Sequence, residues 1–241
     1  MFAISGDVLR MVTKAVRQVS NEARLKMSDK GVIIQAVDPA VVELLVVKMP
    51  ANSFSAYNSE LNGEIGLDFG ELEEILSAVT ADIDVCFTRD KNTGQLLISY
   101  GTTEYTLPLL SLSEVRVLPR TQEMSFDVTV SLDMNQFTTA IKSVKNITST
   151  GDDVTIMTAG KELSVLHSGR DKKVKTSLKY DDDMVEAVAR FSIEYIDGVV
   201  ASLRKCEDVV MSLSMSYPVR FDGNYEGVDL IWIVAPRLEE S

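Results

Sequence analysis

Apolar residues recur along the chain with two different periods, and the alternation of these periods predicts its secondary structure. The spacing i, i+3, i+4, i+7 marks one face of an amphipathic helix, whereas strict alternation marks a strand. Four helical quartets are present: Val12, Ala15, Val16 and Val19; Leu72, Ile75, Leu76 and Val79; Phe137, Ala140, Ile141 and Val144; and Ile196, Val199, Val200 and Leu203. The third begins 125 positions after the first, and the fourth 124 positions after the second, so the chain is an internal repeat of two halves.

Strand-like segments surround each predicted helix in the same order. A short run precedes the helix, and three alternating segments rich in β-branched residues follow it. The preceding runs are FAIS at 2–5, EIGLDF at 64–69, FDVTVS at 126–131 and VARFS at 188–192, and residues suited to capping stand near the helix starts at Asp7, Glu71, Asp133 and Ser192. Turn composition in SDKG, TAGK and SGRDK separates the later segments. The pattern predicts an α+β fold of four strand-helix-three-strand units, with helices on one face of antiparallel sheets.

The strand pattern lapses between the two halves. The segment EVRVLPRTQE at 114–123 contains a proline and has no helical or clean strand period. Its apolar residues Val115, Val117 and Leu118 stand where a flexible linker would carry glycine and serine, so we expect it to lie against the protein. The predicted organisation is an N-terminal domain at 1–113, an extended connector at 114–124 and a similar C-terminal domain at 125–241.

Charge is distributed unevenly along this acidic chain. It has 36 Asp and Glu against 24 Lys and Arg, a net charge of −12 that by itself argues against binding to nucleic acid. The segment RMVTKAVRQV at 10–19 is nevertheless purely cationic, and at about 100° per residue its cations fall roughly opposite the apolar stripe. Cations also stand on the predicted helices of the second half. The candidates for phosphate contact are Arg10, Lys14, Arg17, Lys142, Lys145, Arg204 and Lys205.

No constellation of catalytic residues is recognisable in the sequence. His167 has no acid or nucleophile at motif spacing, and the phosphate-loop, GxSxG and HExxH motifs are absent. The Asp181–Asp183 run follows the segment KVKTSLKY, where we predict a turn, and it lacks the alternating ligand spacing of a calcium loop. Cys86 and Cys206 have no CxxC spacing. We therefore predict no enzyme activity, no metal and no cofactor. The apolar runs are too short to span a bilayer, and a reducing cytoplasm suits the cysteine usage best.

Several segments resemble the sliding clamps of the proliferating cell nuclear antigen type, the archaeal form most closely. They are IIQAVDPAVVELLVV at 33–47, the proline-containing connector and the ending WIVAPRLEE, and the resemblance covers the whole chain. It implies a closed ring of three chains, with helices lining the hole and sheets forming the outer layer. Double-stranded DNA would pass through the hole, attracted weakly and without sequence preference by the helix cations. The second helix departs from the family pattern because it carries Glu71, Glu73 and Glu74.

The resemblance also implies two kinds of protein contact. DNA polymerase, the clamp loader, flap endonuclease and DNA ligase would bind through a short peptide whose glutamine and aromatic plug meet an apolar pocket. The positions that match this pocket are Val37, Val41, Leu44, Leu118, Pro119, Pro218, Ile233, Ala235 and Pro236. Edge strands around Thr103–Pro108 and Lys173–Lys179 would pair between the subunits of a homotrimer. The interface candidates are Thr103, Tyr105, Leu107, Lys173, Lys175 and Ser177.

Two other hypotheses remain open at this point. A small acidic enzyme would use the Asp181–Asp183 run and His167 with a metal, and it would show metal-dependent hydrolysis. A protein-binding scaffold that never encircles DNA would keep its function when Arg10, Lys14 and Arg17 are replaced by alanine, whereas a clamp would lose processivity.

Overall fold

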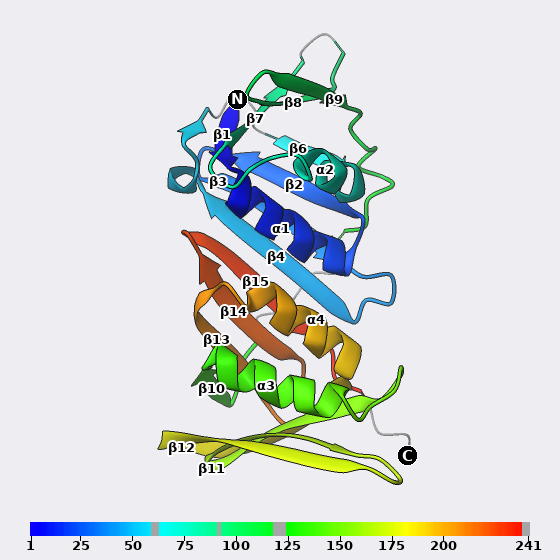
Figure 1. Ribbon diagram of the computed structural model, residues 1–241, viewed down its shortest axis with the longest axis vertical. Helices are drawn as coiled ribbons and strands as arrows, with labels where there is room; N and C mark the ends of the chain where they lie inside the picture. The colour runs from blue at the N-terminus through cyan, green and yellow to red at the C-terminus, as the bar shows by residue number, and fades with distance from the viewer. Residues whose placement is uncertain (59–62, 91–92, 118–123, 238–241) are drawn as a thin grey trace. The chain divides into compact units, whose positions relative to one another are not determined.

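The computed structural model describes residues 1–58, 63–90, 93–117 and 124–237 (Figure 1). The chain divides into two compact units, one comprising Met1–Arg120 with Asn224–Leu230 and the other Thr121–Gly223 with Ile231–Ser241. Helices and antiparallel sheets occur in both units, which confirms the predicted α+β class. None of the helices in these described ranges combines the length and the apolar character that a membrane span requires.

Antiparallel strands form most of the first unit. Their bounds are Phe2–Ser5 (β1), Glu22–Ser28 (β2), Gly31–Val37 (β3), Glu43–Pro50 (β4), Ala56–Tyr57 (β5), Gly63–Asp68 (β6), Asp84–Arg89 (β7), Leu96–Tyr100 (β8) and Thr103–Leu107 (β9), with a 3-10 turn at Ala51–Ser53. One sheet has the order β5-β1-β7-β8-β9, and the neighbouring strands β4-β3-β2-β6 form the other layer. In this layer the register places Ile65, Leu25, Ile34 and Val47 in one row across four strands. All four are buried, because alternate residues of a strand face the same side.

Helices α1 (Gly6–Val19) and α2 (Phe69–Leu76) pack against each other and on these strands (Figure 1). Ser5 caps α1 by accepting a hydrogen bond from the Asp7 amide, and Asp68 caps α2 by accepting one from the Gly70 amide at 2.7 Å. The predicted Asp7 and Glu71 stand in the first turn of each helix instead, where an acid suits the helix dipole.

The second unit contains β10 and β13 with most of β14 and the end of β15, which neighbour one another in the order β10-β13-β14-β15, and a separate two-stranded sheet of β11 and β12. The bounds are Val128–Ser131 (β10), Asp153–Ser168 (β11), Lys173–Ser192 (β12), Glu207–Leu213 (β13), Val219–Tyr225 (β14) and Val228–Val234 (β15). Helices α3 (Met134–Lys145) and α4 (Ile193–Leu203) pack against each other, and both contact β12. Asp133 caps α3, and hydrogen bonds from Gln136 and Asn135 lower the pKa of its carboxyl.

The long β11–β12 hairpin corrects two predictions. The sequence pattern indicates four shorter strands, DVTIMT, ELSVLH, KVKTSLKY and VARFS, with turns at TAGK and after Tyr180, each of which lies inside a single arm of the hairpin. Each arm is one continuous strand (Figure 1). The register between the two strands shifts on either side of Gly160. A β-bulge accommodates extra residues without ending a strand, so both strands continue past this point. The Asp181–Asp183 run therefore lies inside β12 and not in a turn.

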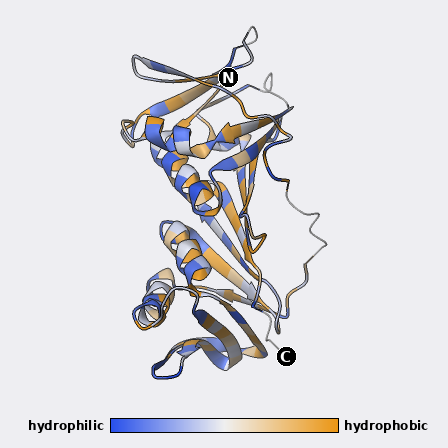
Figure 2. Ribbon diagram, turned by 90° about the vertical axis from the view of Figure 1, so that its right-hand side faces the viewer, coloured by the Kyte–Doolittle hydropathy of each residue, from blue (hydrophilic) through white to orange (hydrophobic). Residues whose placement is uncertain are grey.

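The cores of both units use the predicted apolar positions. Figure 2 shows hydrophobic residues along one side of the helices, with hydrophilic residues along the other. In the second unit the buried rings of Phe137 and Phe221 lie with centroids 6.1 Å apart, and each such burial contributes about 1.5–3 kcal/mol. A Cβ at Gly223 would lie 2.9 Å from Leu203 Cδ2 and 3.1 Å from Cys206 Cβ, so a larger residue there would force these neighbours to move.

Candidate functional site

Helix α1 carries three of the predicted cations, and their surroundings differ. Arg17 Nε donates to Glu73 Oε2 on α2 at 3.1 Å. Arg10 is half-buried and donates to the main-chain carbonyl of Val79. Lys14 is exposed, and within the described part of the chain its side chain has no hydrogen-bond or ion-pair partner. α1 therefore offers one unengaged cation to a phosphate.

The other predicted cations lie on α3 and just beyond the end of α4, where Arg204 is the C-cap and Lys205 follows it. Lys145 Nζ forms an ion pair with Asp197 on α4. Lys142 and Arg204 are exposed, and no side-chain partner for either is present among the residues that the structure describes. Lys205 is also exposed but is engaged in an interaction of its own. This helix pair therefore offers two unengaged cations.

The acids of the two ion pairs between helices occupy equivalent positions of the repeat. Asp197 stands 124 positions after Glu73, which is the offset between the second helices of the two halves. Each acid therefore reaches from a second helix to a cation on the first. A pair of this exposure is worth about 0–1 kcal/mol, so it neutralises charge more than it stabilises the fold. Glu73 is compensated in this way, whereas Glu71 and Glu74 are exposed acids of α2.

Strand β9 holds three of the predicted interface residues and lies at the edge of its sheet. In the described ranges it pairs with β8 alone, from Leu96 opposite Leu107 to Tyr100 opposite Thr103. Thr103 and Tyr105 are exposed, while Leu107 is buried. The ring of Tyr105 stacks on that of Tyr100, with centroids 6.0 Å apart. The outer edge of β9 presents backbone groups to which another strand can bond.

Strand β12 holds the other three, all of them exposed. Lys173 has no ion pair in the described part of the chain, but Lys175 and Ser177 bind Glu162 of β11 at 2.9 and 2.6 Å. Lys179 binds the same carboxylate. Hydrogen bonds from Lys179 above all, and from the neighbouring serines and Lys175, hold the pKa of Glu162 well below its usual range. This face of the hairpin is therefore a preassembled charge cluster beside the β12 edge.

The segment Asp38–Glu43 joins β3 to β4 as a tight loop organised by one side chain. The buried carboxylate of Asp38 accepts hydrogen bonds from the amides of Ala40 at 3.1 Å, Val42 at 2.7 Å and Glu43 at 2.7 Å. The Asp38 amide in turn donates to the Glu43 carbonyl at 3.0 Å. One aspartate thus satisfies the backbone donors that a loop of this curvature would otherwise leave unpaired.

The same loop presents one predicted docking residue and buries two. Val41 has a φ of 57°, in the left-handed region that β-branched residues rarely adopt, and its side chain is 53% exposed. Val37 and Leu44 lie on the flanking strands and are buried. Strain of this kind persists only where the surroundings enforce it, and it is frequent at binding sites. Val41 is therefore the predicted docking residue of this loop that an incoming ligand can reach, beside the exposed Pro39 and Ala40.

Glu43, at the start of β4, is a titratable residue that sequence reasoning missed. It is 1% exposed, and its Oε1 has no hydrogen-bond partner among the described residues. Burial, together with the nearby charge of Asp38, raises the pKa of Glu43 to about 8. The carboxyl is therefore neutral at pH 7 and is held next to the loop that exposes Val41.

The first part of the predicted connector is attached to the first unit. Arg24 of β2 donates from Nε and Nη2 to the carbonyl of Val115, at 3.2 and 3.0 Å. Val115 is buried, and a Cβ at Gly66 would lie 2.8 Å from its Cγ2. The chain thus uses a glycine of β6 to admit the connector and an arginine of β2 to hold it. Arg24 is 91 residues away in sequence, so no local pattern indicates this role.

The connector also touches the Asp38 loop. Arg116 Nη1 donates to the carbonyl of Pro39 at 3.1 Å. The next residue, Val117, is 65% exposed. The predicted docking residues Leu118 and Pro119 lie outside the described residues. Val41 and Val117 are thus two exposed apolar side chains on segments that a hydrogen bond joins.

The remaining predicted docking residues lie near the C-terminal end of the described chain. Ile233 belongs to β15, Ala235 and Pro236 follow that strand, and Pro218 immediately precedes the neighbouring strand β14. All four are half-buried. Arg237 is exposed and is the last residue of this segment that the structure describes. No pattern in the sequence indicates that it belongs among the site residues.

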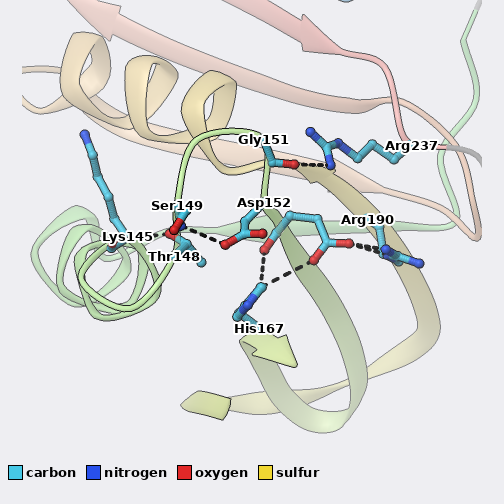
Figure 3. Close-up of polar contacts among 9 residues, drawn as sticks. Lys145, Thr148, Ser149, Gly151, Asp152, His167, Arg190 and Arg237 are labelled. Carbon is cyan, nitrogen blue, oxygen red and sulfur yellow. Dashed lines mark hydrogen bonds and ion pairs between the residues drawn. The ribbon is translucent and has the colours of Figure 1, made fainter. Parts of the chain in front are cut away.

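His167 and the Asp181–Asp183 run are not brought together as a catalytic site. His167 is buried, with Nδ1 2.7 Å from the carbonyl oxygen of Asp153 and 3.4 Å from its Oδ1 (Figure 3). Two acceptors on that side place a proton on Nδ1. The Asp181–Asp183 side chains are exposed on β12. In the part of the chain that the structure describes, no three His, Cys, Asp or Glu residues are grouped so as to hold a metal ion.

Comparison with known proteins gives a family match in the first half of the chain and relatives that match over its full length. Residues 3–106 match the family model of the proliferating cell nuclear antigen N-terminal domain. The chain is 28% identical to a DNA polymerase sliding clamp of Methanosarcina barkeri and 27% identical to one of Archaeoglobus fulgidus; each match covers 99% of this chain and 98% of the relative.

Solved structures agree with this likeness at the level of the fold. The A. fulgidus PCNA that is bound to the C-terminal region of FEN-1 superposes with a TM-score of 0.89 at 24% identity, over 100% of this chain and 99% of that chain. The PCNA of Entamoeba histolytica gives a TM-score of 0.87 at 18% identity, over 98% and 99% of the two chains.

Proposed function

The chain belongs to the proliferating cell nuclear antigen family of DNA polymerase sliding clamps, and on this premise we propose that it encircles duplex DNA and tethers replication proteins to it. The full-length similarity to archaeal sliding clamps supports this function. A clamp has no turnover of its own. The protein works where chromosomal DNA is copied, in the nucleoid of a prokaryotic cytoplasm or in a eukaryotic nucleus.

The observation that carries the DNA contact is the set of unengaged cations on the helices. Lys14, Lys142 and Arg204 are exposed and have no side-chain partner in the described ranges, whereas Arg10, Arg17 and Lys145 are already paired. A few mobile cations give a weak, salt-screened attraction to phosphates with no readout of base sequence. Such contacts guide DNA without holding it, and a closed ring retains DNA by topology.

Ring closure takes place between the edges of β9 and β12 in a homotrimer. β9 presents exposed residues with the acid Glu104 among them, and the facing segment of β12 carries Lys173, Lys175 and Lys179. Backbone pairing of two edge strands removes the unpaired groups of both. The opposite charges of the two strands favour the correct pairing over self-pairing.

Partner proteins dock through an apolar peptide. The A. fulgidus relative binds the C-terminal region of FEN-1, and a similar peptide of a polymerase, clamp loader, flap endonuclease or ligase would use the corresponding surface here. In the first unit this surface includes Val41 and Val117, whose apolar side chains are exposed beside the loop of Asp38. In the second unit, considered by itself, the candidate docking residues are Ala235 and Pro236. An apolar anchor gains affinity when it covers such side chains.

A processivity assay tests this function. The triple variant K14A/K142A/R204A removes the three unengaged cations. The matched control K30A/K161A/R170A removes three exposed cations outside the helices, one of them in β11 and the other two between strands. With the cognate polymerase and clamp loader on primed circular DNA, the first variant is expected to shorten products roughly threefold or more, because the attraction that guides the duplex is lost. The control variant is expected to leave product length unchanged.

Sedimentation of each variant separates loss of DNA contact from loss of the ring. A trimer with full processivity after removal of Lys14, Lys142 and Arg204 would contradict the proposed DNA contact and favour a protein-binding scaffold. A wild-type protein that does not extend product length at all would contradict the clamp function itself.

A further inference from the structure

The segment that follows β15 is held at its last described residue. The Arg237 amide donates to the carbonyl of Arg190 at 2.7 Å, and Arg237 Nη1 donates to the carbonyl of Gly151 at 2.6 Å (Figure 3). Ala235 and Pro236 lie just before these two bonds and are half-buried. Among the described residues, nothing hydrogen-bonds to the backbone of Ala235 or Pro236. One arginine therefore holds a short stretch whose backbone groups are open.

The partners of Arg237 are themselves rigidly supported. Arg190 belongs to β12, opposite Thr155 of β11, and its guanidinium donates from Nε to Asp153 Oδ2 at 2.8 Å. Asp153 is bound in turn by the buried His167. The main-chain anchor of Arg237 is thus set by a strand ladder and by a chain of side-chain contacts that ends in the core.

The second anchor is a tight turn. The amide of Ser149 donates to Asp152 Oδ2 at 2.7 Å, and the amide of Asp152 donates back to the carbonyl of Ser149 at 3.0 Å. Gly151, between them, has a φ of 88°, which L side chains rarely adopt. The carbonyl that accepts the Arg237 side chain is therefore held in one orientation, as Figure 3 shows.

We propose that Arg237 is a positioning residue which presents the backbone of Ala235 and Pro236 to the polar side chain of a docking peptide. This inference rests on the docking function proposed above and adds to it the residue that orders the polar part of the surface. A peptide that meets a preordered backbone group avoids the entropy of ordering it. Loss of Arg237 should therefore weaken the bond to the peptide's glutamine and leave the apolar plug largely unaffected.

A double-mutant cycle by isothermal titration calorimetry tests this role. Two synthetic peptides are compared, one with a glutamine and an aromatic plug and one with that glutamine replaced by alanine. The protein variants are wild type, Arg237→Ala, Arg237→Lys and the control Arg170→Ala, which removes an exposed arginine from another turn of the same unit. Arg237→Ala is expected to bind the glutamine peptide about five- to tenfold more weakly, and the alanine peptide almost as well as wild type does. Arg237→Lys, which keeps a cationic donor, should recover part of the loss.

The outcomes separate this inference from the function on which it rests. Equal weakening of both peptides in Arg237→Ala, or no weakening of either, would overturn the positioning role while leaving docking intact. Failure of the wild-type protein to bind either peptide would overturn the docking function as well. A loss in Arg170→Ala equal to that in Arg237→Ala would assign the effect to net charge and would also overturn the proposal.

Discussion

The Asp38–Glu43 loop of the first unit and the Ala235–Arg237 segment of the second have the same proposed role, but different interactions hold them. In the loop, the buried carboxylate of Asp38 accepts hydrogen bonds from three backbone amides, and Val41 between them has a left-handed conformation. In the segment, an exposed arginine bonds to two carbonyls. One belongs to Arg190, whose side chain forms an ion pair with Asp153, and the other belongs to Gly151 in a tight turn. The loop should respond to pH and to backbone strain, and the segment to salt.

This contrast shows that a docking segment in each unit can be ordered by interactions within that unit. The loop supplies the apolar contact through Val41. The hydrogen bonds of Asp38 hold Val41 in its strained conformation and keep its side chain exposed. The segment carries polar backbone groups, so its position must be exact, whereas its contribution to folding can be small.

The largest expected effect is that of Asp38→Ala. Removal of the carboxylate leaves three amides without their acceptor, so the free energy of unfolding of the first unit should fall by about 3 kcal/mol. Asp38→Asn retains one acceptor oxygen and should lose about half as much. Urea denaturation at pH 7 measures both. A loss below that of an ordinary surface substitution would show that Asp38 does not organise the loop.

Glu43 should make stability depend on pH. Its pKa is about 8 in the folded state and near 4.5 when unfolded, so between these values only the folded state holds the proton. Stability is therefore fully present below about pH 4.5 and falls as pH rises, by about 2 kcal/mol between pH 6 and pH 8. Glu43→Gln should abolish this slope. Denaturant titrations across that range measure it, and an identical slope in both proteins would contradict the buried, neutral carboxyl.

A smaller effect is expected for Asp153→Asn, and it should depend on salt. Loss of the ion pair with Arg190 should cost the second unit about 1 kcal/mol at low ionic strength and less in 1 M NaCl, where charges are screened over about 3 Å. The effect of Asp38→Ala, which breaks bonds to neutral amides, should not shrink in the same way. Equal salt dependence of the two variants would remove the distinction between the two segments.

The smallest effect is a gain. Val41→Asn should stabilise the first unit by about 0.5–1 kcal/mol, because asparagine tolerates the left-handed region better than a β-branched residue. The same change should weaken the binding of an aromatic peptide, since an apolar contact is lost. Val117→Asn is the matched control, because Val117 is equally apolar and exposed but has no positive φ. Thermal unfolding measures the change in stability, and calorimetry measures the change in peptide affinity. Stability should rise while affinity falls at Val41 only; at Val117 stability should not rise.

Local patterns predicted the helices well because helix formation and burial follow the same period. Val12, Val16, Phe137 and Ile141 repeat at helical spacing and are all fully buried. The ends were less predictable. The cap of α2 is Asp68 and not the nearby Glu71, since the choice depends on where the preceding strand ends.

The β11–β12 hairpin was mispredicted because strand length depends on pairing with a distant strand. Thr158, Ala159, Gly160 and Lys161 have turn composition, yet the opposite arm continues past them, and a bulge is enough to accommodate the mismatch. Composition alone cannot distinguish a turn that reverses the chain from a bulge that does not.

The candidate site was predictable as a set of residue types but not as an arrangement. Val37, Val41 and Leu44 look alike in sequence, and only the hydrogen bonds of Asp38 decide that Val41 is the exposed one. The ion pairs of Arg17 and Lys145 join residues 56 and 52 positions apart, so the sequence does not reveal which cations are already engaged. Long-range contacts of this kind leave no periodic signal.

Retention on DNA of different topology tests the central claim most directly. The protein is loaded by its clamp loader onto nicked circular DNA, separated from unbound protein by gel filtration, and measured again after a restriction enzyme linearises the circle. An encircling clamp with weak phosphate contacts remains on the closed circle and leaves the linear DNA within minutes, at physiological salt and at higher salt alike. Equal retention on circular and linear DNA, or loss from both in proportion to salt, would contradict encirclement and identify an ordinary electrostatic DNA-binding protein.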